Sequence, residues 1–112
     1  MKLNPELEAS IETLIENIQT TDIYKSFEEN KRVARRDMTL KNNINRTRSI
    51  RNQLDKMSTG EKNSDMAEGL IDEYDRLMDN TSVHKFSVAE HEFCELYQII
   101  MSRIADKFDL EL

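Results

Sequence analysis

Glycine, proline, cysteine and tryptophan are all scarce in this chain. Its 112 residues include two glycines, one proline, one cysteine and no tryptophan. An all-β domain needs many turn residues, so this composition argues against one. It also argues against disorder, because 38% of the residues are hydrophobic. We therefore predict an all-α protein, with residues 1–112 forming one domain, since single domains have roughly 100–200 residues.

The single cysteine and the lack of long apolar runs also limit where the protein can reside. Cys94 excludes a disulfide within the chain and is typical of a reducing compartment. The first residues lack the apolar run of a secretory signal. The longest uninterrupted apolar stretch is residues 99–101, far short of the roughly 18 residues that a transmembrane helix needs. We expect a cytoplasmic protein that does not insert into membranes.

Apolar side chains recur every three or four residues along nearly the whole chain, which is the pattern of amphipathic helices. It predicts five helices, at about residues 5–19, 22–36, 38–57, 65–79 and 81–108. Asn4, Asp37 and Ser64 have the chemistry of helix N-caps, and Gly60 has that of a C-cap. The last helix would be on the order of 40 Å long, so its far end should project or be covered by a second chain. The predicted fold class is an antiparallel helical bundle of about five helices with a long C-terminal helix.

The same spacing assigns inner faces to the third and fourth helices. On the third helix the inward residues are Leu40, Ile44, Thr47, Ile50, Leu54 and Met57. On the fourth helix they are Met66, Leu70, Ile71, Tyr74, Leu77 and Met78. The methionines are expected to fill the core, because their flexible side chains adapt to irregular gaps.

The net charge of −6 is unevenly distributed along the chain. Residues 1–30 carry two basic and seven acidic side chains, residues 31–56 nine and two, and residues 57–112 five and thirteen. The basic segment either binds an external polyanion or lies beside acidic segments of its own or a neighbouring chain, and we favour the second. Four side chains of the third helix are expected to point outward and to contact protein: Lys41, Arg48, Arg51 and Lys56.

The alternative is an RNA-binding module that uses the basic helix 38–57. Such a module usually stacks bases on aromatic rings, and no aromatic residue lies between Arg32 and Lys62. The acidic segments on either side would also repel a polyanion. We therefore expect a protein partner and no nucleic acid.

The last helix carries an apolar band that is wider than one neighbouring helix can cover. In its C-terminal half the band consists of Leu96, Tyr97, Ile99, Ile100, Met101 and Ile104. Soluble monomers seldom expose a large contiguous apolar patch. The sequence therefore predicts a homodimer that buries this region.

No residue pattern points to catalysis or to a bound cofactor. Residues 91–95 resemble the zinc-protease pattern H-E-x-x-H, but Glu95 replaces the second histidine and no third ligand follows. Cys94 lies one turn from His91 on a helix without a glycine-bearing turn, so we expect a half-buried structural thiol. Gly60 and Gly69 are too far apart to form a phosphate-binding loop. We predict no enzyme activity, no metal and no cofactor.

The order of short motifs along the chain resembles that of a known family. Thr21-Asp22-x-Tyr24-x-x-Phe27 opens the second helix, Asp37-x-x-Leu40 opens the basic helix, and Gly60 lies in the loop after it. Val83-x-x-Phe86-x-x-Ala89-Glu90-x-x-Phe93-x-x-Leu96 leads the last helix and is the most diagnostic element. Over nearly its whole length the chain resembles the YlbF/YmcA family of bacterial regulators, also called the control-of-competence family.

This resemblance implies a small, cytoplasmic, self-associating helical protein of a Gram-positive-type bacterium, without catalytic residues. In the better-studied members, the resemblance implies a subunit of a complex that influences competence, sporulation and biofilm formation. That complex associates with the endoribonuclease of mRNA turnover. Members that share an iron–sulfur cluster carry cysteines in a C-terminal extension. This chain stops at Leu112 with Cys94 alone, so the resemblance does not by itself extend to the cluster or to that particular complex.

Overall fold

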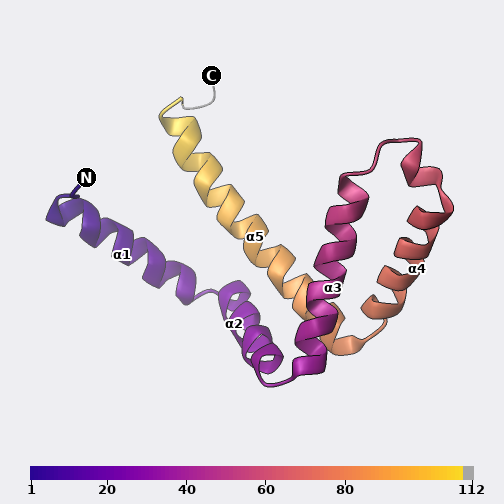
Figure 1. The fold of residues 1–112 in the computed structure, drawn as a ribbon. Coiled ribbons are helices and arrows are strands. Elements are labelled where there is room, and N and C mark those ends of the chain that lie inside the picture. The colour runs from indigo at the N-terminus through magenta and orange to yellow at the C-terminus, as the bar shows by residue number, and fades with distance from the viewer. Residues whose placement is uncertain (110–112) are drawn as a thin grey trace.

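The computed structural model describes residues 1–109, which form α-helices, one short 3₁₀ helix and their connections (Figure 1). The elements are α1 (Pro5–Gln19), α2 (Asp22–Arg35), α3 (Met38–Asp55), η1 (Glu61–Asn63), α4 (Asp65–Met78) and α5 (Thr81–Lys107). No strand is present in this range. The predicted all-α class, the five helices and the long last helix are confirmed. Over the same residues, no helix is long and apolar enough to cross a membrane.

Each α-helix begins at a polar side chain that accepts hydrogen bonds from the first backbone N–H groups. Such a cap satisfies donors that have no partner within the helix. The capping residues are Asn4, Thr21, Asp37, Ser64 and Asn80. The three caps predicted at Asn4, Asp37 and Ser64 are therefore confirmed.

The connection between α3 and α4 differs from the prediction. The helix ends at Asp55, two residues earlier than predicted, and Lys56 is its C-cap. The predicted capping role of Gly60 at the end of α3 is wrong, because Gly60 has a φ of −66° and lies directly before η1 as its N-cap residue. The N–H of Lys56 donates to the carbonyl of Asn52 in a right-handed turn, so the chain needs no left-handed residue there.

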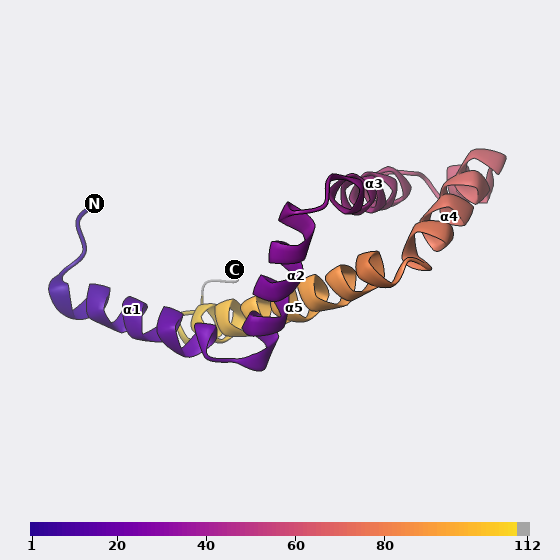
Figure 2. The same ribbon diagram turned by 90° about the horizontal axis from the view of Figure 1, so that it is seen from below.

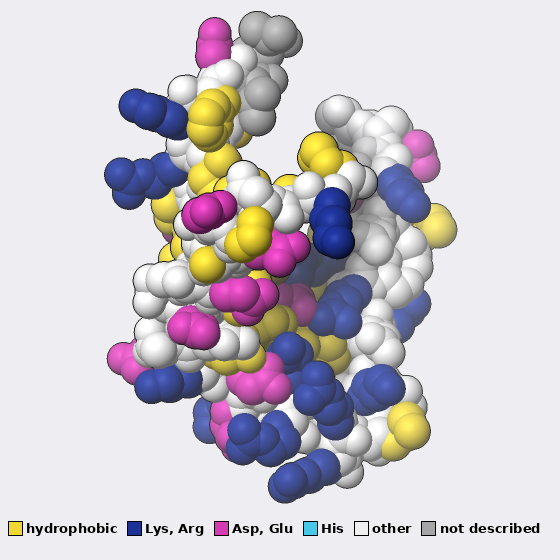
Figure 3. Space-filling model, turned by 90° about the vertical axis from the view of Figure 1, so that its left-hand side faces the viewer, with side chains coloured by type: hydrophobic (Ala, Val, Ile, Leu, Met, Phe, Trp, Pro, Cys, Tyr) yellow, Lys and Arg dark blue, Asp and Glu magenta, His cyan; other side chains and the backbone are white. Residues whose placement is uncertain are grey.

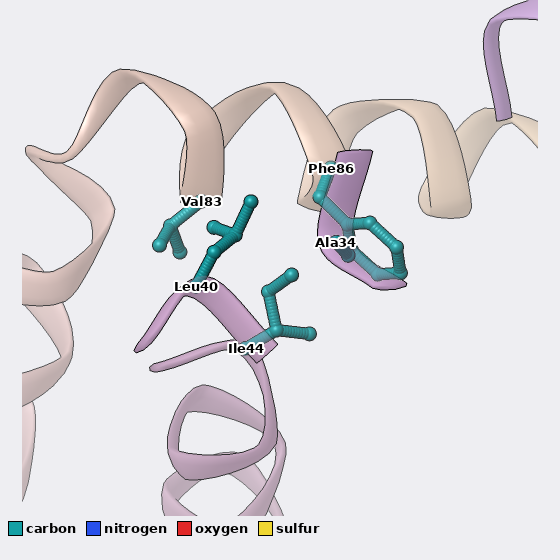
Figure 4. Packing of buried hydrophobic residues seen from close by; sticks show 5 residues of the cluster. All are labelled: Ala34, Leu40, Ile44, Val83 and Phe86. Atoms are coloured by element: carbon teal, nitrogen blue, oxygen red, sulfur yellow. The ribbon is translucent and has the colours of Figure 1, made fainter. Parts of the chain in front are cut away.

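The core lies where α2, α3 and α5 meet. Figure 4 shows Val83 and Phe86 of α5 facing Leu40 and Ile44 of α3, with Ala34 of α2 beside the Phe86 ring. On α3 the predicted inner stripe is confirmed at four positions, which are buried: Leu40, Ile44, Thr47 and Ile50. The Thr47 hydroxyl donates to the Ile44 carbonyl at 2.7 Å, so the one polar side chain of this stripe is satisfied within the helix.

On α4 the inner face is narrower than predicted. Ala67 and Leu70 are buried, whereas Met66 is 65% exposed and Ile71 is 44% exposed. Helix α4 packs against α3, and the small side chain of Ala67 has no exposed surface. The prediction that Met66 and Ile71 point inward is wrong.

The helices form an open arrangement. Figures 1 and 2 show α3 and α4 as a hairpin, while α1 and the C-terminal half of α5 extend away from it and diverge from each other. The radius of gyration is 18.4 Å, whereas a compact domain of this length would have about 13 Å. Helix α1 contains no buried residue, and the last buried residue of α5 is Ala89. Within the described residues of one chain, the far end of α5 is therefore not covered; cover by a second chain, the other outcome that the sequence predicts, stays a prediction.

Candidate interaction surfaces

An apolar stripe runs along the outer half of α5 without a covering element. Tyr97, Met101, Ile104 and Phe108 are spaced four, three and four residues apart, which places them on one helix face. They are between 38% and 70% exposed, whereas Ile99, which is 51% exposed, lies on the opposite side of the helix. Of the other residues in the predicted band, Leu96 and Ile100 are half-buried.

Helix α1 carries a second stripe of the same kind. Leu7, Ile11, Leu14 and Ile15 are between 36% and 46% exposed. Together these four residues and the stripe of Tyr97, Met101, Ile104 and Phe108 are called the uncovered apolar surface. The surface is built on two helices that share one end of the open fold (Figure 1).

The stripe on α5 becomes exposed because α2 is shorter than α5. Phe93 of α5 is half-buried. Its ring stacks on that of Phe27 of α2, with the ring centroids 5.0 Å apart. It also contacts the ring of Tyr24, with the centroids 6.0 Å apart. Tyr24 lies in the first turn of α2, so the chain turns away toward α1 close to this point. Beyond Phe93, α5 continues for almost four turns with no buried residue.

The basic segment is partly neutralised by acidic residues of the same chain. Arg46 of α3 binds Glu73 of α4, with distances of 2.6 Å from Nε to Oε2 and 2.7 Å from Nη2 to Oε1. Arg48 of α3 binds Glu90 of α5. On α2, Glu28 and Glu29 pair with basic residues of the following turns, namely Lys31, Arg32 and Arg35.

These ion pairs change the protonation behaviour of three groups. The hydrogen bond from Arg46 lowers the pKa of the Glu73 carboxyl, and the bond to Glu73 raises the pKa of Arg46. The hydrogen bond from Lys31 lowers the pKa of Glu28. In each case the ion pair favours the charged form of the side chain over the neutral form.

The four basic residues predicted to face outward are all exposed, but they do not form one group. Lys41, Arg51 and Lys56 form no ion pair with any residue from 1 to 109, whereas Arg48 is bound by Glu90 and lies over the Phe86 ring, 5.4 Å from its centroid. Lys41 and Arg48 line a common hollow, and Arg51 and Lys56 do not line it.

That hollow lies between α2, α3 and α5 and is called the basic hollow. Its volume is about 260 Å³, and its rim carries Lys31, Arg35, Lys41 and Arg48 above the core residues Ala34, Ile44 and Phe86. Sequence reasoning missed the contribution of α2. The available signal was that Lys31 and Arg35 lie four residues apart and Lys41 and Arg48 seven apart, so each pair occupies one helix face.

The residues considered for metal binding or catalysis stay dispersed. His91 and Glu95 are both exposed and 3.9 Å apart. Among residues 1–109, no three histidine, cysteine, aspartate or glutamate side chains gather where they could hold a metal ion. The prediction that Cys94 is half-buried is wrong, since the thiol is exposed. Phe93 faces α2, so the next residue along α5 turns away from that helix.

Comparison with known proteins gives one match. The family described as control of competence regulator ComK, YlbF/YmcA, matches residues 7–109, which is nearly the whole chain. No curated protein and no solved structure gives a significant match. The matched range includes all five helices apart from the first two residues of α1. The chain therefore belongs to the YlbF/YmcA family of competence regulators.

Proposed function

We propose that this protein is a non-catalytic cytoplasmic regulator, folded as a single domain, that acts by forming a homodimer and by binding other proteins. The observation that carries the proposal is the uncovered apolar surface. Soluble monomers rarely leave such stripes in contact with water, because burying apolar area contributes about 25 cal/mol per Å². A closed symmetric dimer would cover the same surface on both copies.

The open fold supports self-association through α1 and the outer half of α5 rather than through the core. The buried residues of α2, α3 and α5 form a complete cluster within one chain. The uncovered apolar surface lies outside it, so a second copy can dock there without rearranging the core. The homodimer is therefore expected to assemble from folded monomers.

Light scattering at micromolar concentration tests the homodimer. The wild-type protein should show twice the chain mass of 13.2 kDa. Ile104→Asp should give the monomer mass with unchanged helical circular dichroism. Ile104 is exposed in the monomer, so the change leaves the fold intact. In the dimer the introduced carboxylate would be buried, which opposes association. Met66→Asp is the matched control, since Met66 is an exposed apolar residue on α4. A monomer mass for the wild-type protein even at about 100 μM would contradict the homodimer.

The family membership supports a role in competence regulation, and the family resemblance extends this to mRNA turnover or developmental control. Purification of the tagged protein from its native bacterium, followed by mass spectrometry, tests this assignment. We expect proteins of RNA degradation or of developmental regulation to be enriched over the Ile104→Asp variant. If neither class is enriched, the assignment to these pathways is wrong.

A further inference from the structure

The basic hollow combines charge at its rim with an apolar floor. Ala34, Ile44 and Phe86 form the floor and belong to the core cluster, so the hollow is a place where the core reaches the surface. Figure 3 shows a shaded recess that contains yellow side chains, with dark-blue side chains to its right and below it and magenta ones to its left. Its volume of about 260 Å³ lies below the roughly 300–1,000 Å³ of pockets that enclose small-molecule ligands. It suits an inserted side chain better than a cofactor.

The rim has more positive than negative charge. Four cationic side chains line it, and two carboxylates accompany them: Glu28 lies 3.1 Å from Lys31 and 3.8 Å from Arg35, and Glu90 binds Arg48. Lys41 makes no ion pair with the described part of the chain, and the Asn45 side chain, which also lines the hollow, makes no hydrogen bond there. The rim thus offers an incoming anion two exposed donors that make no ion pair or hydrogen bond within the described chain, although the chain as a whole has a net charge of −6.

We propose that the basic hollow binds an acidic segment of a partner protein, which inserts one apolar side chain against Ala34 and Ile44. Carboxylates on either side of that side chain bind Lys41 and the Asn45 side chain at the rim. The apolar contact supplies affinity, and the charges supply selection and register. This inference rests on the proposed function as a protein-binding regulator, but none of the hollow's residues belongs to the uncovered apolar surface.

Two features favour a protein segment over a nucleic acid. Phe86 is only 6% exposed, and the Arg48 guanidinium already lies over its ring, so no open ring is available for a base. Glu28 and Glu90 lie at the rim, where they would repel a continuous phosphate backbone. Separate carboxylates around an apolar side chain can reach Lys41 and Asn45 without approaching these two acids.

The test uses amide chemical shifts and a synthetic probe. The probe is a helical peptide of about 18 residues, long enough to be partly helical alone, with one central leucine and glutamates four residues to each side. Titrated into the full-length protein, it should shift amides along residues 41–48 and 31–35 to saturation. Two control peptides replace the glutamates by glutamine or the leucine by alanine, and both should bind at least tenfold more weakly.

Matched variants locate the site. Lys41→Glu should weaken binding of the acidic peptide about tenfold, because it reverses the one rim charge that has no partner in the described chain. Lys56→Glu makes the same charge change at the C-cap of α3, outside the hollow. It should alter the affinity less than about twofold. Both positions are exposed, so neither variant should unfold the protein.

Four results would overturn the proposal. They are the absence of shifts at millimolar peptide, equal binding of the glutamine peptide, hollow shifts that grow with protein concentration alone and so indicate a second copy, and equal binding of a single-stranded RNA at the same amides. Repeating the titration with Ile104→Asp separates the two inferences. Loss of the homodimer leaves the hollow intact, so a failed homodimer and an empty hollow are distinct outcomes.

Discussion

Arg46 and Glu73 join α3 to α4 through two parallel hydrogen bonds of 2.6 and 2.7 Å. The two residues are 27 positions apart and lie on opposite arms of the hairpin. The planar guanidinium matches the carboxylate at both oxygens, which fixes the orientation of the two helices as well as their distance. The pair thus contributes to the arrangement of the basic helix as well as neutralising part of its charge.

The first prediction concerns the pH dependence of this ion pair. Because the pKa of Glu73 is lowered in the folded protein, its contribution is present above the ordinary carboxyl pKa of 4.5 and is lost as the pH falls through the lowered value. Wild type should have a higher urea midpoint than Glu73→Gln at pH 7, and the two midpoints should converge in acid. Glu92→Gln, an exposed change on α5, should match wild type throughout. A gap that persists at about pH 2 would contradict the ion pair's role.

The second prediction concerns the core. Ile50 has no exposed surface, so Ile50→Ala should lower the free energy of unfolding by about 2–5 kcal/mol, through lost burial and the cavity left behind. Urea unfolding followed by circular dichroism measures this loss. Met38→Ala on the same helix is the control, because Met38 is 70% exposed and should change the free energy by less than about 0.5 kcal/mol. Similar values for both variants would show that α3 is packed differently.

Helix starts and N-caps were predictable because they depend on neighbours in the sequence. The side chain of Asn4 accepts from the N–H of Leu7, and that of Asp37 accepts from the N–H of Leu40, both three residues on. Such local bonds are set by residue type and spacing. The same holds for the buried stripe on α3, which has the regular period of a helix with one covered face.

Tertiary features were less predictable, because periodicity identifies a stripe but not the element that covers it. The stripe of Leu7 and Ile11 on α1 is as regular as that of Leu40 and Ile44 on α3, yet the first is exposed and the second buried. The basic hollow also depends on how α2 rotates against α3. That rotation follows from the small side chain of Ala34 packing near Phe86, which charge counts along the sequence do not contain.

The third prediction is that the purified protein holds no iron–sulfur cluster. A cluster usually takes four thiolates, whereas one chain supplies Cys94 alone and a homodimer supplies two. After anaerobic purification the protein should show no absorbance near about 400 nm and no bound iron by elemental analysis. Cys94→Ser is the control and should have the same spectrum. A brown wild-type protein that loses its colour in Cys94→Ser would indicate a cluster bridging two chains through this exposed thiol.

The fourth prediction separates the proposed function from RNA binding by the basic helix. Of its arginines, Arg46 and Arg48 are already bound by Glu73 and Glu90, so an RNA phosphate would have to compete with a carboxylate at each. We therefore expect no binding of single-stranded RNA in a filter assay at physiological salt.

If RNA did bind through this face, the logarithm of the affinity would fall with the logarithm of salt by about 0.7 per phosphate contacted, and Arg51→Glu with Lys56→Glu would reduce that slope. Sub-micromolar binding with such a slope would replace the protein-binding role of this helix by an RNA-binding one. The absence of binding, together with an acidic peptide that shifts the amides near Lys41, would assign its charge to protein contacts.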